Sequence, residues 1–402
     1  MSRLPAVLFA CTPAKRIGQN RSRESELVHF QGAIVAKKDE RLNLVSLFSG
    51  GGGLDIGLEA AGFRTRFAND IVPHCCRTLE ANLPDSPSVV CEDISSLTAK
   101  DIRKKSNLPK DAEIDLLAGG PPCQAFSIIG RRKGRADPRG QMVYQYFRIL
   151  AELKPKVFVF ENVFGLLTVE KGEVFNVVCE KLAQPSEKLH YDIKVFRVNA
   201  VDYGVPQFRD RVIIIGSRIG KNVEKIDPIT FENPQKGQLR YRTVTDAFRD
   251  LPEPNEEKPA NHTGRVHSEQ IIKRYAGLAF GERDNHTRIN KLDPNRPSFT
   301  IICGSNCGSG KGRVHPYQPR EATPRESARI QTFPDSWSFD GHGRYAISQV
   351  GNAVPPLLAF AIGNAIRKQI FGFKEISFKS ALKQMEQTHL FPELFKKEVN
   401  DV

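Results

Sequence analysis

Short apolar runs alternate with longer segments of mixed polarity over the first half of the chain. The runs that we expect to form strands are 43–48, 64–68, 88–90, 115–118 and 157–160. The segments between them that suit helices are 54–61, 73–82 and 142–153. Strands and helices in alternation are typical of a parallel sheet covered on both faces, so the pattern predicts an α/β, doubly wound fold.

The pattern changes after residue 160. Residues 191–198 and 211–216 are two β-rich runs joined by a short loop, which predicts an antiparallel hairpin at the edge of the sheet. Residues 219–322 are rich in Pro, Gly, Asn, Arg and His and have few periodic apolar runs, which favours a smaller, loop-rich second domain. The apolar segment 355–370 begins with proline and predicts a helix that returns to the first domain.

The composition of the 402 residues is that of a globular chain, with 40% hydrophobic and 26% charged residues. The net charge of +13 favours an anionic partner such as nucleic acid, although a solvated basic surface would give the same charge. No apolar run reaches the roughly 18 residues of a membrane helix. Residues 4–11 resemble a lipoprotein signal only faintly, because their apolar core is short. We therefore expect a cytoplasmic protein with no membrane partner.

The eight cysteines are scattered, which is typical of reduced thiols. They form no CxxC pair, and Cys303 and Cys307 have no second ligand pair near them. The sequence therefore predicts no metal site.

A glycine turn follows the first predicted strand. Residues 44–48 run into four consecutive glycines at 50–53, an arrangement that lets backbone approach a ligand closely. Asp70 follows Gly50 by twenty residues, where an acidic side chain can bind the hydroxyls of a ribose. Asp55 stands where a dinucleotide fingerprint beginning at Gly50 needs its last glycine. The turn therefore favours a nucleoside cofactor without a pyrophosphate, and a turn without ligand is the alternative.

A proline–cysteine loop follows the strand at 115–118. Two glycines and two prolines lead to Cys123, at the carboxyl end of a strand, where ligands bind in open α/β sheets. The prolines stiffen the loop and could hold a nucleophilic thiol outward, whereas a buried cysteine that only packs is the alternative. The basic residues that follow could meet phosphates: Arg131, Arg132, Lys133, Arg135 and Arg139.

Two further groups could act on a ring. Glu161 ends the strand at 157–160, where a carboxylic acid could protonate or hydrogen-bond a ring nitrogen, unless it only begins a helix. Gln207, Arg209 and Arg211 alternate along the chain and would share one face if the segment is extended. Two arginines on one face suit an anionic or carbonyl-rich ligand.

Six segments, in this order, resemble the cytosine-C5 DNA methyltransferase family of restriction–modification type. The resemblance runs from about residue 43 to residue 370, and any one segment alone would carry little weight. The segments are FSGGGG at 48–53, GPPCQAFS at 120–127, ENV at 161–163, QFRDR at 207–211, RESARIQTFPDSW at 325–337 and QVGNAVPP at 349–356.

The resemblance implies transfer of a methyl group from S-adenosyl-L-methionine to carbon 5 of cytosine in a specific double-stranded DNA sequence. It implies base flipping, a covalent bond from Cys123 to cytosine C6, and no metal. It also implies a methyltransferase sheet with a smaller target-recognition domain. The expected parts are an N-terminal extension at 1–40, a catalytic and cofactor-binding domain at 41–218, a target-recognition domain at 219–322, a return to the catalytic domain at 323–372 and a C-terminal tail at 373–402.

Site residues carry over from the matching motifs. The catalytic group is Cys123, Glu161, Arg209 and Arg211. The cofactor-binding group is Phe48, Gly50, Gly52, Asp70, Ile71, Asp93, Ile94, Pro122, Asn352 and Ala353. One departure is Ser46, where many members of the family carry Asp, in an ordering contact near the methionine end of the cofactor.

Two alternatives remain beside DNA methylation. RNA cytosine-C5 methylation uses the same chemistry, but the Cys-Phe-Thr tripeptide typical of the transfer-RNA branch is missing. A catalytically inactive DNA-binding module would not need Cys123 and Glu161. We expect a monomeric bacterial or phage-encoded enzyme that protects host DNA in a restriction–modification system, with residues 219–322 choosing the target sequence.

Overall fold

The computed structural model describes residues 29–30, 33–34, 41–83, 87–109, 112–122, 141–302 and 313–395. Residues 1–41 and 42–402 form two compact units. In the first, β1 (His29–Phe30) and β2 (Ala33–Ile34) pair antiparallel. The second contains every described motif. Residues 219–322 belong to this second unit, and the target-recognition domain expected there stays a prediction.

A seven-stranded sheet organises the larger unit, in the order β5-β4-β3-β6-β7-β9-β8. Five strands are parallel, as expected: β3 (Leu42–Leu47), β4 (Phe63–Asp70), β5 (Ser88–Cys91), β6 (Leu116–Gly119) and β7 (Val157–Val163). The predicted hairpin is also present: β9 (Asp210–Ser217) pairs antiparallel with β7 and with the edge strand β8 (Asp192–Asn199).

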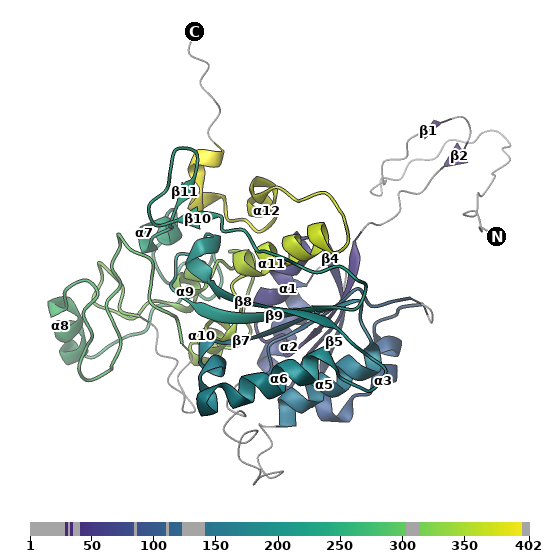
Figure 1. Ribbon diagram of the computed structural model, residues 1–402. Coiled ribbons are helices and arrows are strands. Elements are labelled where there is room, and N and C mark those ends of the chain that lie inside the picture. The colour runs from purple at the N-terminus through teal and green to yellow at the C-terminus, as the bar shows by residue number, and fades with distance from the viewer. Residues whose placement is uncertain are drawn as a thin grey trace, which may run out of the picture. The chain divides into compact units, whose positions relative to one another are not determined.

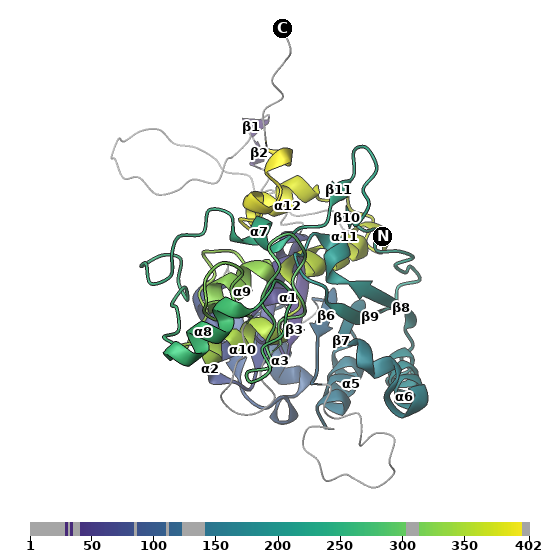
Figure 2. The same ribbon diagram turned by 90° about the vertical axis from the view of Figure 1, so that its left-hand side faces the viewer.

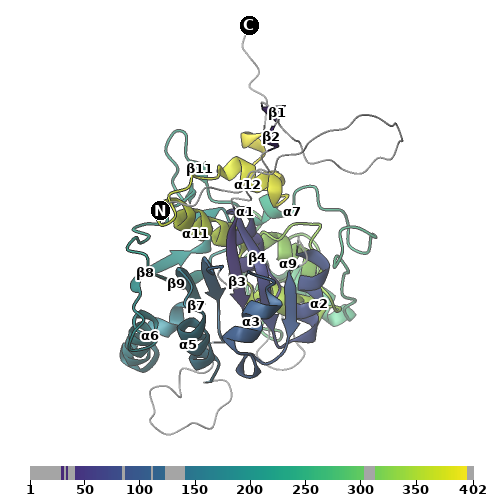
Figure 3. The same ribbon diagram turned by 90° about the vertical axis from the view of Figure 1, so that its right-hand side faces the viewer.

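Helices cover both faces of the sheet, which confirms the doubly wound fold. On one face lie α1 (Gly53–Ala60), α2 (Pro73–Asn82) and α11 (Pro356–Gln369). On the other face lie α3 (Ala99–Lys105), α5 (Gln141–Leu153) and α6 (Glu173–Ala183). Figure 1 shows α1 and α11 above the sheet and α5 and α6 below it, and Figure 3 shows the same layers from the side of β3 and β4.

Helix α11 lies in the predicted apolar segment 355–370 and packs against α1. It packs so closely on α1 that a Cβ atom at Gly57 would lie 2.2 Å from the Pro356 carbonyl oxygen. By length and composition the stretch Arg344–Gln369 could cross a membrane, but 83% of its apolar window is buried inside the protein. This burial makes it weak evidence for a membrane span.

The remaining strands and α-helices are short. They are β10 (Thr230–Phe231), β11 (Leu239–Arg240), α7 (Val244–Phe248), α8 (Glu269–Gly277), α9 (Pro324–Ile330), α10 (Arg344–Asn352) and α12 (Phe378–Gln384). Four of them lie within 219–322: β10, β11, α7 and α8. Helix α8 lies far from the sheet in Figure 1 and comes toward the viewer in Figure 2. The expected tail packs on the core as far as it is described, because Phe378 contacts both Phe360 and Phe391.

Candidate active site

The expected site residues between Phe48 and Glu161 that the structure describes lie at or just after the carboxyl ends of the parallel strands. The glycine turn follows β3, Asp70 ends β4, Asp93 follows β5 and Glu161 lies near the end of β7. Pro121 and Pro122 follow β6. These ends meet at one edge of the sheet, so residues far apart in the sequence can form one site.

The glycine turn needs its glycines for conformation and for space. Gly50 and Gly52 have φ of 57° and 84°, which side chains disfavour, and even Phe48 has φ of 55°. A Cβ atom at Gly53 would lie 2.2 Å from the Val354 carbonyl oxygen. The turn is therefore packed against the residues at the end of α10 and just after it, where the predicted cofactor residues Asn352 and Ala353 lie.

Asp70 binds the turn directly. One carboxylate oxygen accepts a hydrogen bond from the Gly50 N–H at 2.8 Å, and the other accepts from the Val72 N–H at 2.8 Å. Burial raises the pKa of Asp70, and the hydrogen bonds from these backbone groups oppose that rise. Ile71, beside it, exposes 60% of its surface. The pair presents a carboxylate and an apolar surface together.

The next acidic residue, Asp93, caps a short 3₁₀ helix (Ile94–Ser96) by accepting from the Ser95 N–H at 2.8 Å. Ile94 lies in the core under α5 and is almost fully buried. Asp93 can therefore face a ligand, whereas Ile94 fixes the position of Asp93 from below.

Glu161 forms a buried ion pair with Arg211. The Arg211 Nε lies 2.7 Å from the Glu161 Oε1, and both side chains are about 10% exposed. The other carboxylate oxygen lies so close to Gly120 that a Cβ atom there would stand 2.5 Å from it. Asn162 donates to the Pro121 carbonyl oxygen at 3.1 Å. An acid, an arginine and the beginning of the proline loop thus lie side by side.

Arg209 does not share this environment. It is 1% exposed, and its guanidinium donates to the carbonyl oxygens of Ile301, Gly351 and Ala353 at 3.0, 2.7 and 2.9 Å. Gln207 lies beside it and accepts from the Ile301 N–H at 3.0 Å. Gln207 and Arg209 therefore bind backbone together, whereas Arg211 faces Glu161.

Several expected residues lie outside the described residues. They include Cys123, the basic residues at 131–139 and, within the expected target-recognition domain, residues 303–312. Of the loop before Cys123, Pro121 is buried and Pro122 is exposed. Within the described residues, no group of three or more His, Cys, Asp or Glu side chains could hold a metal ion.

The arginines and asparagines of 219–322 divide into internal and exposed ones. Asn261 exchanges two hydrogen bonds of 2.8 Å with the Phe339 backbone, and Arg274 pairs with the buried Asp284 at 3.1 Å. Burial lowers the pKa of Arg313 to about 10. The exposed ones include Arg265, Arg283, Asn285, Arg288 and Asn295.

Two residues near the turn carried no role in the sequence prediction. Asp55, in the first turn of α1, is fully buried, and Trp337 donates to the Gly51 carbonyl oxygen at 3.0 Å. The sequence indicated a place near the turn for these two residues only weakly. Asp55 interrupts the glycine pattern, and Trp337 lies inside the motif at 325–337.

Comparisons with known proteins agree with this geometry. A family model for the C-5 cytosine-specific DNA methylase matches residues 42–368. The chain is 36% identical over 349 residues to the Type II methyltransferase M.PspPI of Psychrobacter sp., covering 82% of this chain and 79% of that protein. It is 42% identical over 221 residues to the Type II methyltransferase M.AquIA of Picosynechococcus sp., covering 52% and 88%. An E. coli prophage-encoded protein described as a DNA modification methyltransferase matches in structure, with a TM-score of 0.67, 30% identity and coverage of 82% of this chain and 99% of that one.

Proposed function

This chain belongs to the C-5 cytosine-specific DNA methylase family, and on that premise we propose how its residues methylate carbon 5 of cytosine in a specific double-stranded DNA sequence. The observation that carries the proposal is the buried pair of Glu161 and Arg211 beside Pro121, at the start of the loop that leads to Cys123. In this proposal the Glu161 carboxyl group and the Arg211 guanidinium act on the same base as the Cys123 thiol, which follows two residues after Pro121.

The cofactor site is proposed at the glycine turn. S-adenosyl-L-methionine supplies an activated methyl group there. The turn offers backbone without side chains, Asp70 keeps unused lone pairs for ribose hydroxyls, and Ile71 offers an apolar surface for a purine ring. The residues proposed to form the site are Phe48, Gly50, Gly52, Asp70, Ile71, Asp93, Ile94, Pro122, Asn352 and Ala353, with Ile94 acting from below.

The proposed reaction begins with a cytosine flipped out of the duplex, because C5 is out of reach inside it. The Cys123 thiolate adds to C6 while Glu161 protonates or hydrogen-bonds N3, so that the electrons of the ring collect at C5. C5 takes the methyl group from the sulfonium sulfur of S-adenosyl-L-methionine, and the electrons of the broken carbon–sulfur bond stay on S-adenosylhomocysteine. Loss of the C5 proton then restores the double bond between C5 and C6 and expels the thiolate.

Arg211 is the arginine that we assign to the cytosine. Its ion pair holds the Glu161 carboxyl in place, and its remaining N–H groups can donate to the O2 carbonyl as negative charge grows there. Arg209 was expected beside it, but its donors bind three backbone carbonyl groups. We propose that Arg209 instead positions the segments at 301 and 351–353 around the site.

Replacing Cys123 tests the proposal. Cys123→Ser should still bind DNA but lose methylation by at least about a thousandfold, because a hydroxyl is a far weaker nucleophile than a thiolate. The measurement is transfer of labelled methyl groups to duplex DNA. Cys179→Ser on α6, a cysteine outside the site, is the matched control and should keep full activity.

Two further arms separate the alternatives. The wild type should become covalently trapped on DNA that contains 5-fluorocytosine, since fluorine cannot leave as a proton does. Transfer to transfer RNA but not to DNA would support RNA methylation, and DNA binding without any transfer would support an inactive module. Near-normal turnover by Cys123→Ser would contradict the mechanism.

The relatives named above are Type II methyltransferases. We propose the corresponding role here, protection of host DNA in a restriction–modification system. Bisulfite sequencing of DNA from a host that expresses the chain should show methylation at one recurring sequence. Methylation spread over unrelated sequences would argue against this role.

A further inference from the structure

Trp337 is the single tryptophan of the chain and lies against the glycine turn. Its indole N–H donates to the Gly51 carbonyl oxygen at 3.0 Å, in a buried environment. Its ring also fills the space beside Gly52, because a Cβ atom there would lie 2.5 Å from the ring carbon Cζ2. One side chain therefore contacts two successive residues of the turn, one through a hydrogen bond and one through packing.

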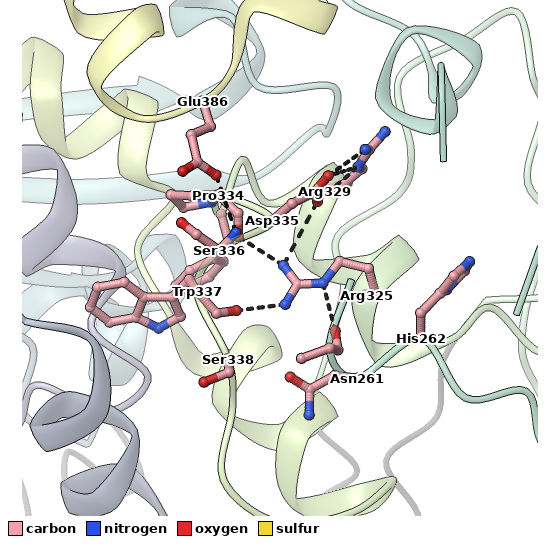
Figure 4. A network of polar contacts seen from close by, with 12 residues as sticks. Asn261, His262, Arg325, Arg329, Pro334, Asp335, Ser336, Trp337, Ser338 and Glu386 are labelled. Carbon is pink, nitrogen blue, oxygen red and sulfur yellow. Dashed lines mark hydrogen bonds and ion pairs between the residues drawn. The ribbon is translucent and has the colours of Figure 1, made fainter. Parts of the chain in front are cut away.

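The backbone of Trp337 is held by a buried arginine. Arg325 is 0% exposed and donates to the carbonyl oxygens of Pro334 at 2.8 Å and of Trp337 at 2.5 Å. Its Nε donates to the Ala260 carbonyl oxygen at 2.9 Å. Figure 4 shows this guanidinium between Trp337 and the segment that contains Asn261. Burial lowers the pKa of Arg325 to about 10, so the cation persists at neutral pH.

The residues after Trp337 are anchored as well. Ser338 and Asn82 of α2 exchange two hydrogen bonds, of 2.9 and 2.8 Å. Phe339 and Asn261 exchange two more, both of 2.8 Å. Trp337 is therefore fixed to α2 on one side and to the predicted recognition segment on the other, and its ring is a rigid support for the turn.

Such a support matters because the turn is rich in glycine. Glycine loses more conformational freedom on ordering than any other residue, so a free turn of this kind would have to be ordered by its ligand. Asp70 accepts a hydrogen bond from the Gly50 N–H, and Trp337, 286 residues further along the chain, donates one to the Gly51 carbonyl oxygen. If the turn is already ordered before the ligand binds, no binding free energy is lost in ordering it.

We propose that Trp337 is a positioning residue of the cofactor site, which orders the glycine turn and links it, through Arg325, to residues 260–261. The proposal rests on the cofactor site described under the proposed function. It assigns no contact between Trp337 and the cofactor. The effect should therefore appear in cofactor affinity rather than in the chemical step.

Trp337→Phe tests the proposal, because phenylalanine keeps an aromatic ring and removes the N–H donor. The variant should bind S-adenosylhomocysteine about five- to tenfold more weakly by calorimetry, since the buried Gly51 carbonyl oxygen loses its partner and the turn its anchor. KM for S-adenosylmethionine should rise by a similar factor, while kcat stays within about twofold at saturation. The matched control is Phe391→Leu, a fully buried aromatic residue that packs on Phe378. It should lower the melting temperature and leave the affinity unchanged.

Arg325→Lys gives a second, independent variant. If both residues act on the turn through one path, the double variant should lose less affinity than the two single losses multiplied together. In the wild type, S-adenosylhomocysteine should also change the fluorescence of the single tryptophan.

The outcomes separate this inference from the proposed function. Unchanged affinity in Trp337→Phe, or an equal loss in Phe391→Leu, would overturn the positioning role while the wild type still binds and methylates. A wild type that binds no S-adenosylhomocysteine would overturn the cofactor site itself.

Discussion

A carboxyl group is buried directly after the glycine turn. Asp55 is 0% exposed, and neither of its oxygens has a hydrogen-bond partner among the described residues. Nearby, the hydroxyl groups of Ser46 and Ser49 lie 2.8 Å apart. Burial raises the pKa of Asp55 to about 7. This chain therefore has a serine at position 46, where the family resemblance implies an acid, and it buries a carboxyl group on the adjoining helix α1.

The raised pKa of Asp55 predicts how stability depends on pH. The folded protein holds this proton more tightly than the unfolded chain, whose carboxyl has a pKa near 3.8. The contribution to stability is therefore complete below about pH 4 and is lost as the pH rises to about 7. Over three pKa units the loss is about 4 kcal/mol at most.

Asp55→Asn removes this titration, so the variant should gain stability over the wild type between pH 4 and pH 7. Urea unfolding at several pH values measures the difference. The exposed Asp192→Asn is the control and should follow the wild type at every pH. Parallel curves for Asp55→Asn and the wild type would show that the buried carboxyl does not titrate as described.

The site residues differ in how far the sequence reveals them. The positions of Glu161 and Asp70 were predictable because each lies at or near the end of a strand whose position the apolar pattern fixes. The backbone contacts of Arg209 were not, because β9 begins only at Asp210 and the alternation rule does not reach back to Arg209. Its partners at 301, 351 and 353 lie 92 to 144 residues away along the chain. Such contacts depend on the complete fold.

At the scale of elements, local sequence patterns predict the strands but not the contacts within the loops. The five parallel strands follow from local apolar runs and agree with the structure to within a few residues. Residues 219–322 lack such runs, and their order comes from single polar side chains. Asp284, for example, accepts from the Thr287 N–H at 2.6 Å and pairs with Arg274. No periodic pattern in the sequence predicts these contacts.

The turn that begins at Asp284 is an exposed feature of this segment that several polar contacts hold. Asp284 and Ile289 pair through a backbone hydrogen bond of 2.9 Å, and Arg283, Asn285 and Arg288 are exposed between and beside them. Burial raises the pKa of Asp284, but hydrogen bonds from Thr287 and the ion pair with Arg274 lower it to about 2. The turn thus keeps its shape at any physiological pH.

This geometry predicts different effects for two arginines. Arg288→Ala should relax the target sequence at one base position or weaken specific binding by about 1–3 kcal/mol, because Arg is the side chain best suited to guanine edges. Its melting temperature should not change. Arg274→Ala should mainly lower the melting temperature, since Arg274 holds Asp284. Sequencing of methylated sites and thermal unfolding together measure both effects. A fully specific Arg288→Ala enzyme would remove this turn from target recognition.

At the scale of the whole molecule, the charge of +13 suits a polyanion but does not locate it. The internal arginines contribute to the charge without being able to meet DNA. Arg209 and Arg325 are buried on backbone carbonyl groups, and Arg329 is paired with Asp335. Net charge therefore overstates the electrostatic contact, and the slope of affinity against salt is the better measure.

The last prediction uses that slope. Arg131 and Arg132 follow the proline–cysteine loop and should contact phosphates rather than bases. Replacing both with Ala should lower affinity for all DNA sequences alike and reduce the slope of log affinity against log salt by about 2. Lys379→Ala with Lys383→Ala, on α12, removes the same charge elsewhere and should leave the slope almost unchanged. An equal reduction in that control would mean that only net charge matters, and a change of the methylated sequence in the arginine variant would mean that the loop reads bases.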